Sequence, residues 1–359
     1  MQNARIQSVD ILRGITIAAM ILVNTPGSWG SVYSPFLHAE WHGLTPTDLV
    51  FPFFLFIVGC SIAFAYKGKQ PDAAAYRKIT IRSLKLVGLG LFLGAFTLTF
   101  PFFKEWSSIR FPGVLQRIGL CFFFAAVIAL NANWKVILGV VVTLLLGYWA
   151  WMGFIPMPDG TAPTFDRAPN NWAMYVDKFI LGSHTWQLDY DPEGLLSTLP
   201  SIATTLIGVL VGRLLIFGKD ADKLTGMFSG AALMITVGIA WNFAFPLNKA
   251  LWSSSFVLVT AGLATGLLGV IYYLTDVRQI AFGEIFKRVG SNALILYFLS
   301  SLISKIFGIL GVHSWLYTNL YLHDFMPEKL SSLLYALSVV AFYILLGNWL
   351  YKRKIFFRV

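Results

Sequence analysis

Charged side chains are scarce in this chain. Asp, Glu, Lys and Arg make up 12% of its 359 residues, whereas 57% of the residues are hydrophobic, and the mean hydropathy is +0.70. These values are typical of a chain whose solvent is lipid, and they leave no segment with the composition of a separate soluble domain. We therefore predict an integral membrane protein.

Cysteine and internal repeats are also nearly absent. The two cysteines, Cys60 and Cys121, both lie in apolar segments. This placement excludes a disulfide framework, favours packing roles and gives no sign of a metal site. No motif recurs with a period of about 20 to 50 residues, which weakens the inverted-repeat pattern of many secondary transporters.

Long apolar runs, by contrast, are abundant. About ten of them are long enough to cross roughly 30 Å of hydrocarbon. We predict an all-α, polytopic helix bundle in which residues 1–359 form a single transmembrane domain. The expected spans lie near residues 11–25, 48–66, 84–101, 113–130, 134–152, 195–216, 227–245, 253–274, 290–309 and 331–350.

The basic residues predict how this bundle is oriented, because short loops rich in Lys and Arg stay in the cytoplasm. An N-in, C-in arrangement with an even number of spans places most of the 27 Lys and Arg residues inside and all five histidines outside. The net charge of +10 then indicates orientation and an affinity for anionic lipid headgroups, with no nucleic-acid partner. The long outer loop near 153–194 is rich in Pro, Asp, Asn and aromatics, and we expect it to fold over the outer mouth.

Three polar features interrupt the apolar pattern. His38 lies where a polar loop enters the second apolar run, and its imidazole can exchange protons near neutral pH. Arg117 lies about one turn inside the fourth span, beside Gln116, where an arginine faces a cavity, a carboxylate or an anionic ligand; a buried structural ion pair is the alternative. The basic segment 67–85 is either a simple inside-positive loop or a phosphate-binding surface.

Several sequence blocks together resemble one family. These blocks are SVDILRGITIAAMILVN at 8–24, His-Ala-x-Trp-x-Gly-Leu-Thr-x-x-Asp-Leu-Val-Phe-Pro at 38–52, FPGVLQRIG at 111–119, DPEGLLSTLPS at 191–201 and NKALWSSSFVLVTAG at 248–262. In this order they are similar to the heparan-alpha-glucosaminide N-acetyltransferase family and its bacterial relatives. The resemblance extends over nearly the whole chain.

The resemblance implies a polytopic acyltransferase of the bacterial inner membrane. Such an enzyme takes acetyl-CoA from the cytosolic side and delivers the acetyl group to the amine of a glucosamine-type sugar on the far side. The resemblance also implies a central catalytic histidine, which matches His38, and an asparagine that matches Asn24. A homodimer is expected from the same resemblance.

Thioester aminolysis needs a base for the amine proton and a donor for the developing oxyanion. His38 can act as the base or carry the acetyl group, and Asn24 can donate to the oxyanion or hold the imidazole. Asp48 either orients His38, as carboxylates do in catalytic triads, or caps the second span. Both interpretations of Asp48 stay open at this point.

The remaining candidate residues are assigned to the two substrates. For the acceptor sugar, the candidates are an aromatic ring and two carboxylates, Trp41, Asp191 and Glu193, whose alternative role is hydrogen bonding between loops. For acetyl-CoA, the expected phosphate contacts are Arg77, Lys78 and Arg82. The expected lining of the pantetheine path or reaction chamber is Gln116, Arg117, Asn248, Lys249 and Trp252.

Two other functions fit the same composition. A transporter of amino sugars or of N-acetylglucosamine would also need a polar mouth, buried charge and about ten spans. A membrane acyltransferase with a different donor or a hydroxyl acceptor is the other alternative. The His38 loop and the missing repeats disfavour transport.

Overall fold

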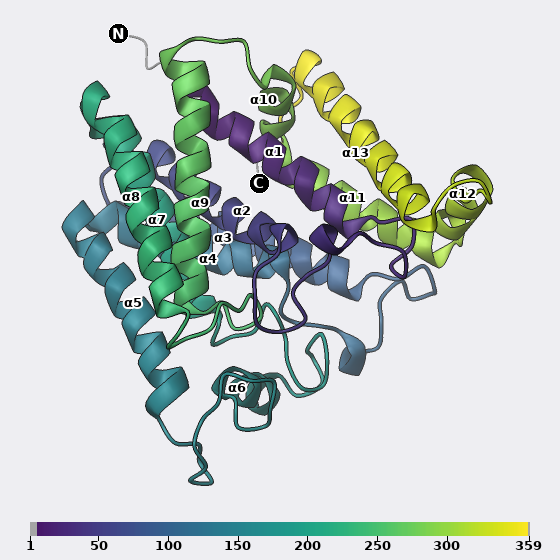
Figure 1. Ribbon diagram of the computed structural model, residues 1–359, viewed down its shortest axis with the longest axis horizontal. Helices are drawn as coiled ribbons and strands as arrows, with labels where there is room; N and C mark the ends of the chain where they lie inside the picture. The colour runs from purple at the N-terminus through teal and green to yellow at the C-terminus, as the bar shows by residue number, and fades with distance from the viewer. Residues whose placement is uncertain (1–5, 358–359) are drawn as a thin grey trace.

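The computed structural model describes residues 6–357, and the regular secondary structure of this part of the chain is helical, with no β-strand (Figure 1). The α-helices are α1 (Gln7–Asn24), α2 (Val50–Ala65), α3 (Ala73–Ala95), α4 (Val114–Asn131), α5 (Trp134–Phe154), α6 (Trp172–Leu181), α7 (Thr198–Phe217), α8 (Asp220–Trp241), α9 (Ser254–Tyr272), α10 (Glu284–Gly290), α11 (Ala293–Ile309), α12 (Val312–Leu320) and α13 (Glu328–Lys352). The predicted all-α class is confirmed.

Eight helices of the described chain are long and apolar enough to cross a membrane, or nine if the bent pair α10 and α11 forms one span. The predicted number of about ten is not confirmed, and the difference lies in the third range, 84–101. There the helix is α3, which begins at Ala73 because Asp72 caps it, accepting a hydrogen bond from the Ala75 amide at 2.6 Å. Basic residues that were expected in a loop therefore lie inside this helix.

The centre of the bundle is built by α2 against α7. A methyl group added at Gly59 of α2 would lie 1.9 Å from the Thr205 carbonyl oxygen, and one added at Gly208 of α7 would lie 2.0 Å from that of Phe56. Only glycine allows the two backbones to approach this closely. Since α7 has 20 residues, it extends for about 30 Å and joins two ends of the bundle with different chemistry.

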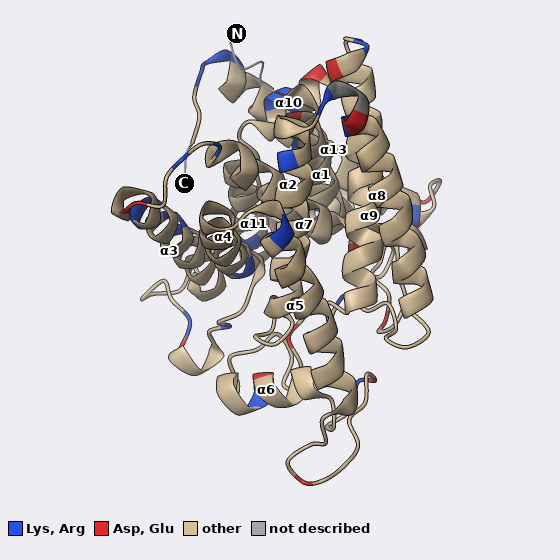
Figure 2. Ribbon diagram, turned by 90° about the vertical axis from the view of Figure 1, so that its left-hand side faces the viewer, with Lys and Arg blue, Asp and Glu red and all other residues tan. Residues whose placement is uncertain are grey.

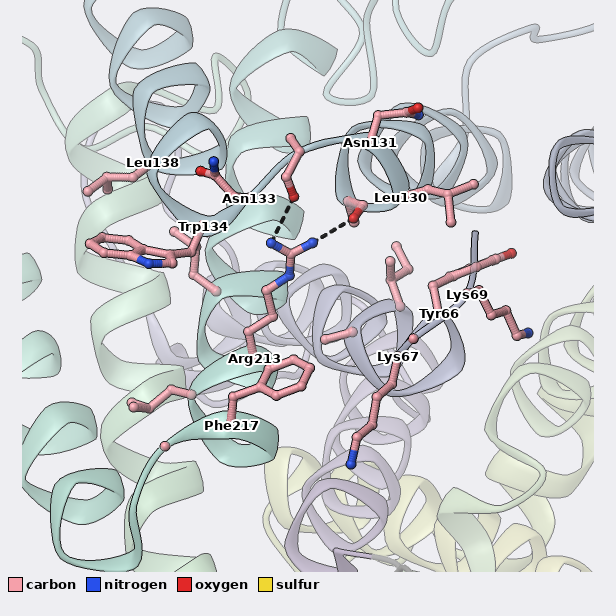
Figure 3. Close-up of a pocket in the computed structure, with 18 residues that line it drawn as sticks. Tyr66, Lys67, Lys69, Leu130, Asn131, Asn133, Trp134, Leu138, Arg213 and Phe217 are labelled. Atoms are coloured by element: carbon pink, nitrogen blue, oxygen red, sulfur yellow. Dashed lines mark hydrogen bonds between the residues drawn. The ribbon is translucent and has the colours of Figure 1, made fainter. Parts of the chain in front are cut away.

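One end, which the charge pattern predicts to be cytoplasmic, holds a pocket of about 850 Å³ between α2, α4, α5 and α7 (Figure 3). Its cations are Lys67, Lys69 and Arg213, and aromatic rings, including that of Trp134, line it as well. The Arg213 guanidinium donates to the Ala132 carbonyl, just beyond α4, at 2.9 Å and to the Ala129 carbonyl, near the end of α4, at 2.6 Å.

A second pocket of about 900 Å³ shares Lys67 and also contains Arg13 and Lys223. Figure 2 shows many of the basic residues in this part of the molecule, near α10 and the start of α1. Five of the basic residues predicted for one side of the membrane thus line two pockets that share Lys67.

Candidate active site

The opposite end contains a His–Asp pair in the loop that enters α2. His38 Nδ1 lies 2.6 Å from Asp48 Oδ1. The other carboxylate oxygen, Oδ2, accepts hydrogen bonds from the Thr45 amide, the Thr45 hydroxyl and the Ala39 amide at 3.0, 2.9 and 3.1 Å. Asp48 therefore caps the short helix 46–49 and binds the imidazole at the same time, and its catalytic role stays a prediction.

The contacts of this pair define the state of the His38 ring. An ionised carboxylate can only accept hydrogen bonds, so the proton of a neutral ring lies on Nδ1 and the lone pair on Nε2. Asp48 is buried, with its side chain 1% exposed, while the His38 side chain is 49% exposed. The nitrogen that carries the lone pair can thus meet a substrate.

Lys249, from the loop between α8 and α9, completes the group around His38. Its Nζ lies 3.2 Å from His38 Nδ1 and 3.1 Å from Nε2. Because a C–H group stands between the two ring nitrogens, an atom equally close to both lies over the face of the ring and not in its plane. Lys249 therefore does not lie along the in-plane lone pair of Nε2.

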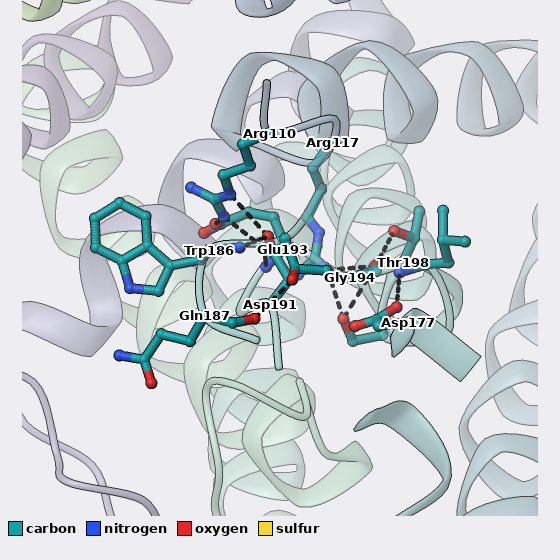
Figure 4. Close-up of polar contacts among 12 residues, drawn as sticks. Arg110, Arg117, Asp177, Trp186, Gln187, Asp191, Glu193, Gly194 and Thr198 are labelled. Atoms are coloured by element: carbon teal, nitrogen blue, oxygen red, sulfur yellow. Dashed lines mark hydrogen bonds and ion pairs between the residues drawn. The ribbon is translucent and has the colours of Figure 1, made fainter. Parts of the chain in front are cut away.

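Arg110, to which the sequence assigned no role, binds two carboxylates of the loop that precedes α7 (Figure 4). It binds Asp191 through two parallel hydrogen bonds of 2.7 and 2.5 Å and Glu193 through one of 2.5 Å. Asp191 also accepts from the backbone amides of Trp186 and Glu193. Its carboxylate is fully buried in these contacts, which fit the loop-to-loop role better than a sugar contact.

Glu193 differs from Asp191 in facing the cations of the site. Although burial would raise the pKa of the Glu193 carboxyl, the positive charges of Arg110, Arg117 and Lys249 hold it below its usual range. Glu193 is therefore an anion that partly balances Lys249.

Arg117 is the most buried cation of this end, with 1% of its surface exposed. One guanidinium nitrogen donates to the Gly194 carbonyl at 2.9 Å and to the Ser197 hydroxyl at 2.5 Å, and the group lies 5.2 Å from the centre of the Trp252 ring. Its Nε and Nη1 have no hydrogen-bond partner among the described residues. Gln116 points elsewhere, toward Gly90 of α3, so the two neighbours do not line one surface.

Behind this site lies a buried acid on α6 that the sequence analysis also did not single out. Asp177 accepts a hydrogen bond from the Leu195 amide at 2.8 Å, and its carboxylate packs against Gly194 so closely that no side chain fits there. Burial raises the pKa of Asp177 to about 7. The negative charge of Asp191 also raises this pKa, whereas the hydrogen bond from Leu195 lowers it.

The long loop after α5, which was predicted to cover the outer mouth, contacts the His38 loop. Trp41 Nε1 donates to the Phe165 carbonyl at 2.9 Å, and its ring meets that of Tyr190 edge to face. A second His–Asp contact joins His42 Nε2 to Asp166 at 3.0 Å, and Asn248 Nδ2 lies 3.3 Å from His42 Nδ1. Asn248 and Lys249 are therefore brought to the histidine loop.

Other predicted residues lie apart from this group. Asn24, at the exposed end of α1, donates to the Met20 carbonyl at 2.7 Å and lines a pocket of about 620 Å³ with His313; within residues 6–357 it has no hydrogen bond to His38. On α3, Arg77 and Lys78 are exposed, and Arg82 lies 4.7 Å from the ring centre of Phe122. These three basic side chains do not line the basic pockets described above.

Among the residues that the structure describes, no group of three or more His, Cys, Asp or Glu side chains is arranged to hold a metal ion. The chemical groups of this end are instead an imidazole, an amine, carboxylates and guanidinium groups. Such a set can support general acid–base and acyl-transfer chemistry.

Comparison with known proteins matches residues 5–234 to the family described as heparan-alpha-glucosaminide N-acetyltransferase, catalytic. Over 420 residues the chain is 29% identical to heparan-alpha-glucosaminide N-acetyltransferase of Homo sapiens, and over 416 residues it is 28% identical to the same-named protein of Mus musculus. Each alignment covers 99% of this chain and 60% of the relative. The matched family region includes His38, Asp48, Arg110, Arg117 and Glu193.

Proposed function

This chain belongs to the heparan-alpha-glucosaminide N-acetyltransferase family, and we propose that it is a membrane acetyltransferase that acts on the amine of a glucosamine-type sugar. The acetyl donor is acetyl-CoA from the cytosolic side, and the acceptor reacts on the opposite side. The curated relatives carry this activity in their names, although the chain spans about 60% of their length.

The observation that carries the proposal is the orientation of the exposed His38 ring by the buried carboxylate of Asp48. Asp48 binds Nδ1 at 2.6 Å and leaves the Nε2 lone pair directed away from the carboxylate. Such a nitrogen can take the amine proton of the acceptor or attack the thioester carbonyl. The Asp48 carboxylate stabilises the positive charge that either reaction places on the ring.

For the donor, the basic pocket at the other end of α7 offers what a nucleotide phosphate needs. Lys67 and Lys69 carry their charge on flexible side chains beside aromatic rings, and the pocket is large enough for the nucleotide part of CoA. We assign Trp252 and Arg117, two of whose guanidinium nitrogens have no hydrogen-bond partner among the described residues, to the path of the acetyl end of the donor.

For the acceptor, we assign Trp41 and Glu193 to the sugar side of His38. An aromatic ring can stack on a sugar face, and a carboxylate can receive hydroxyl or ammonium groups. We further propose that residues 1–359 act as one domain in the bacterial inner membrane and as a homodimer, which native mass measurement in detergent would test.

The decisive experiment uses purified protein in vesicles with radiolabelled acetyl-CoA and glucosamine. We expect N-acetylglucosamine to form with wild-type protein and its formation to be lost with His38→Ala. Sugar uptake into the same vesicles without acetyl transfer would contradict the proposal and support the transporter alternative.

A further inference from the structure

Lys249 places a primary amine beside the nitrogen that is proposed to receive the acetyl group. Its Nζ lies 3.1 Å from His38 Nε2, over the face of the ring. The chain between α8 and α9 holds it there, because neighbouring Asn248 accepts a hydrogen bond from the Leu251 amide at 2.8 Å and is itself fully buried. The backbone that carries Lys249 is therefore held by a buried turn.

Lys249 lies on one of the two faces from which a nucleophile attacks an acyl-imidazole. An acetyl group on Nε2 is conjugated with the ring and lies in its plane, so its carbonyl carbon is attacked from above or below that plane. Reacting atoms about 3 to 3.5 Å apart are in a near-attack arrangement. Lys249 Nζ lies 3.1 Å from Nε2, the atom to which the acetyl carbon would be bonded, so a small movement of the lysine side chain brings the amine to that carbon.

We propose that Lys249 is an internal acetyl acceptor, which receives the acetyl group from His38 when no amino sugar is bound. This inference rests on the proposed function, in which His38 carries the acetyl group. The product, an amide on Nζ, removes the positive charge from beside His38 and fills the place of the sugar amine. Modified protein would be inactive.

The reaction balances with acetyl-CoA alone. His38 Nε2 attacks the thioester, the C–S bond breaks, and the CoA thiolate leaves while Asp48 stabilises the acetyl-imidazolium. Neutral Lys249 then forms the C–N bond, the bond between the acetyl carbon and Nε2 breaks, and the proton lost from Nζ passes through Nε2 to the thiolate. The products are acetylated Lys249 and CoA.

The charges around Lys249 decide how often its amine is neutral. Burial lowers the pKa of the Lys249 ammonium, and Arg117 acts in the same direction, whereas Glu193 and Asp48 oppose them. The lowered pKa increases the fraction of Lys249 that is a neutral amine, whereas the negative charge of Glu193 favours the ammonium form. Loss of the Glu193 charge should speed the modification.

The test is to incubate the reconstituted wild-type protein with acetyl-CoA and no sugar, and to locate added acetyl groups by peptide mass spectrometry. Lys104, which is exposed and predicted to lie on the same side of the membrane, reports non-enzymatic acetylation. We expect Lys249 to be modified on the order of tenfold faster than Lys104. The rate at Lys249 should rise with pH and fall when glucosamine is added.

Two variants separate this inference from the function on which it rests. His38→Ala should reduce the rate at Lys249 to that at Lys104, and Glu193→Gln should increase it several-fold. Unmodified Lys249 in protein that acetylates glucosamine would overturn the inference and leave the proposed function intact. Equal modification of Lys249 in the His38→Ala variant would overturn it as well, because the acetyl group would not have come from His38.

Discussion

The loops around His38 and the pocket of about 850 Å³ at the other end of the bundle differ in the partners of their cations. Around His38, cations face carboxylates: Arg110 binds both Asp191 and Glu193, and Asp48 holds the imidazole. In the pocket at the other end, Arg213 binds carbonyl oxygens and Lys67 lies 5.8 Å from the centre of the Phe217 ring.

The difference separates two kinds of site. Charges that are paired and partly buried are held in fixed positions, which catalysis requires. Cations that face carbonyls and aromatic rings keep their net positive charge, which is suited to an incoming anion. We therefore expect substitutions at the His38 end to change the rate of acetyl transfer and substitutions at the other end to change the affinity for the donor.

The largest effect is expected for His38→Ala. Removing the imidazole, whose free lone pair is oriented by Asp48, should lower kcat for acetyl transfer by about 10³-fold. The rate is measured with radiolabelled acetyl-CoA in vesicles, and thermal unfolding checks that the variant is folded. A residual rate above about one tenth of wild type would mean that another residue carries the chemistry. It would contradict the expectation that the His38 end controls the rate of acetyl transfer.

The next largest effect separates the two roles of Asp48. Asp48→Asn keeps an acceptor for the backbone amides of Thr45 and Ala39 but loses the charge beside His38, so kcat should fall by about 10²-fold. Thr45→Ala removes a partner of the cap without touching the imidazole and serves as the matched control. Equal losses of rate in both variants would mean that Asp48 acts only as a cap.

Much of the fold could be predicted because membranes impose simple rules. Apolar runs and basic loops locate most of the helices and group their ends. The start of α3 was predicted wrongly, since hydropathy favours the apolar half from residue 84 onward while the cap at Asp72 starts the helix at Ala73. The close contact between Gly59 and α7 was not predicted either, because the sequence does not show which helix packs against α2.

The candidate site was predictable where its residues are close in the sequence. His38 and Asp48 are ten residues apart and joined by one loop, so their pairing could be anticipated. Lys249 was assigned to the donor path, because nothing in the sequence reveals that a loop more than 200 residues away reaches His38. Arg110 directly precedes the block FPGVLQRIG, but its carboxylate partners depend on tertiary structure, which the sequence does not reveal.

A smaller effect is expected at the basic end. Lys67→Ala and Lys69→Ala should together raise the KM for acetyl-CoA about fivefold and leave kcat nearly unchanged, because exposed charges contribute modestly to phosphate binding. Raising the salt concentration should weaken donor binding in wild type more than in the double variant. The double variant Arg77→Ala, Lys78→Ala is the matched comparison on α3.

The two double variants compare how strongly the basic pocket and the exposed surface of α3 bind the donor phosphates. A larger increase in KM for the α3 variant would place the donor phosphates on α3, as the charge pattern first indicated. A fall in kcat without a change in KM for the pocket variant would show that the basic end takes part in the chemistry, which would break the contrast between the two ends.

The smallest effect concerns stability at the His38 end. Burial raises the pKa of Asp177 to about 7 in the folded chain. At pH values between the ordinary pKa of an aspartate and 7, the folded chain therefore keeps a proton on this carboxyl, whereas the unfolded chain has released it. Stability should therefore fall as the pH rises through this range and level off above it. Thermal unfolding in detergent should show wild type a few degrees more stable at about pH 5 than at about pH 8.

The matched variant for this measurement is Asp177→Asn, which keeps a neutral side chain of nearly the same shape at all pH values. The difference in unfolding temperature between the two pH values should be smaller in this variant than in wild type, because the titrating carboxyl is gone. An unchanged difference would contradict the assignment to Asp177. It would mean that the positive charge of Arg117 keeps the Asp177 carboxylate ionised. The ion pairs of the His38 end would then include a residue of α6.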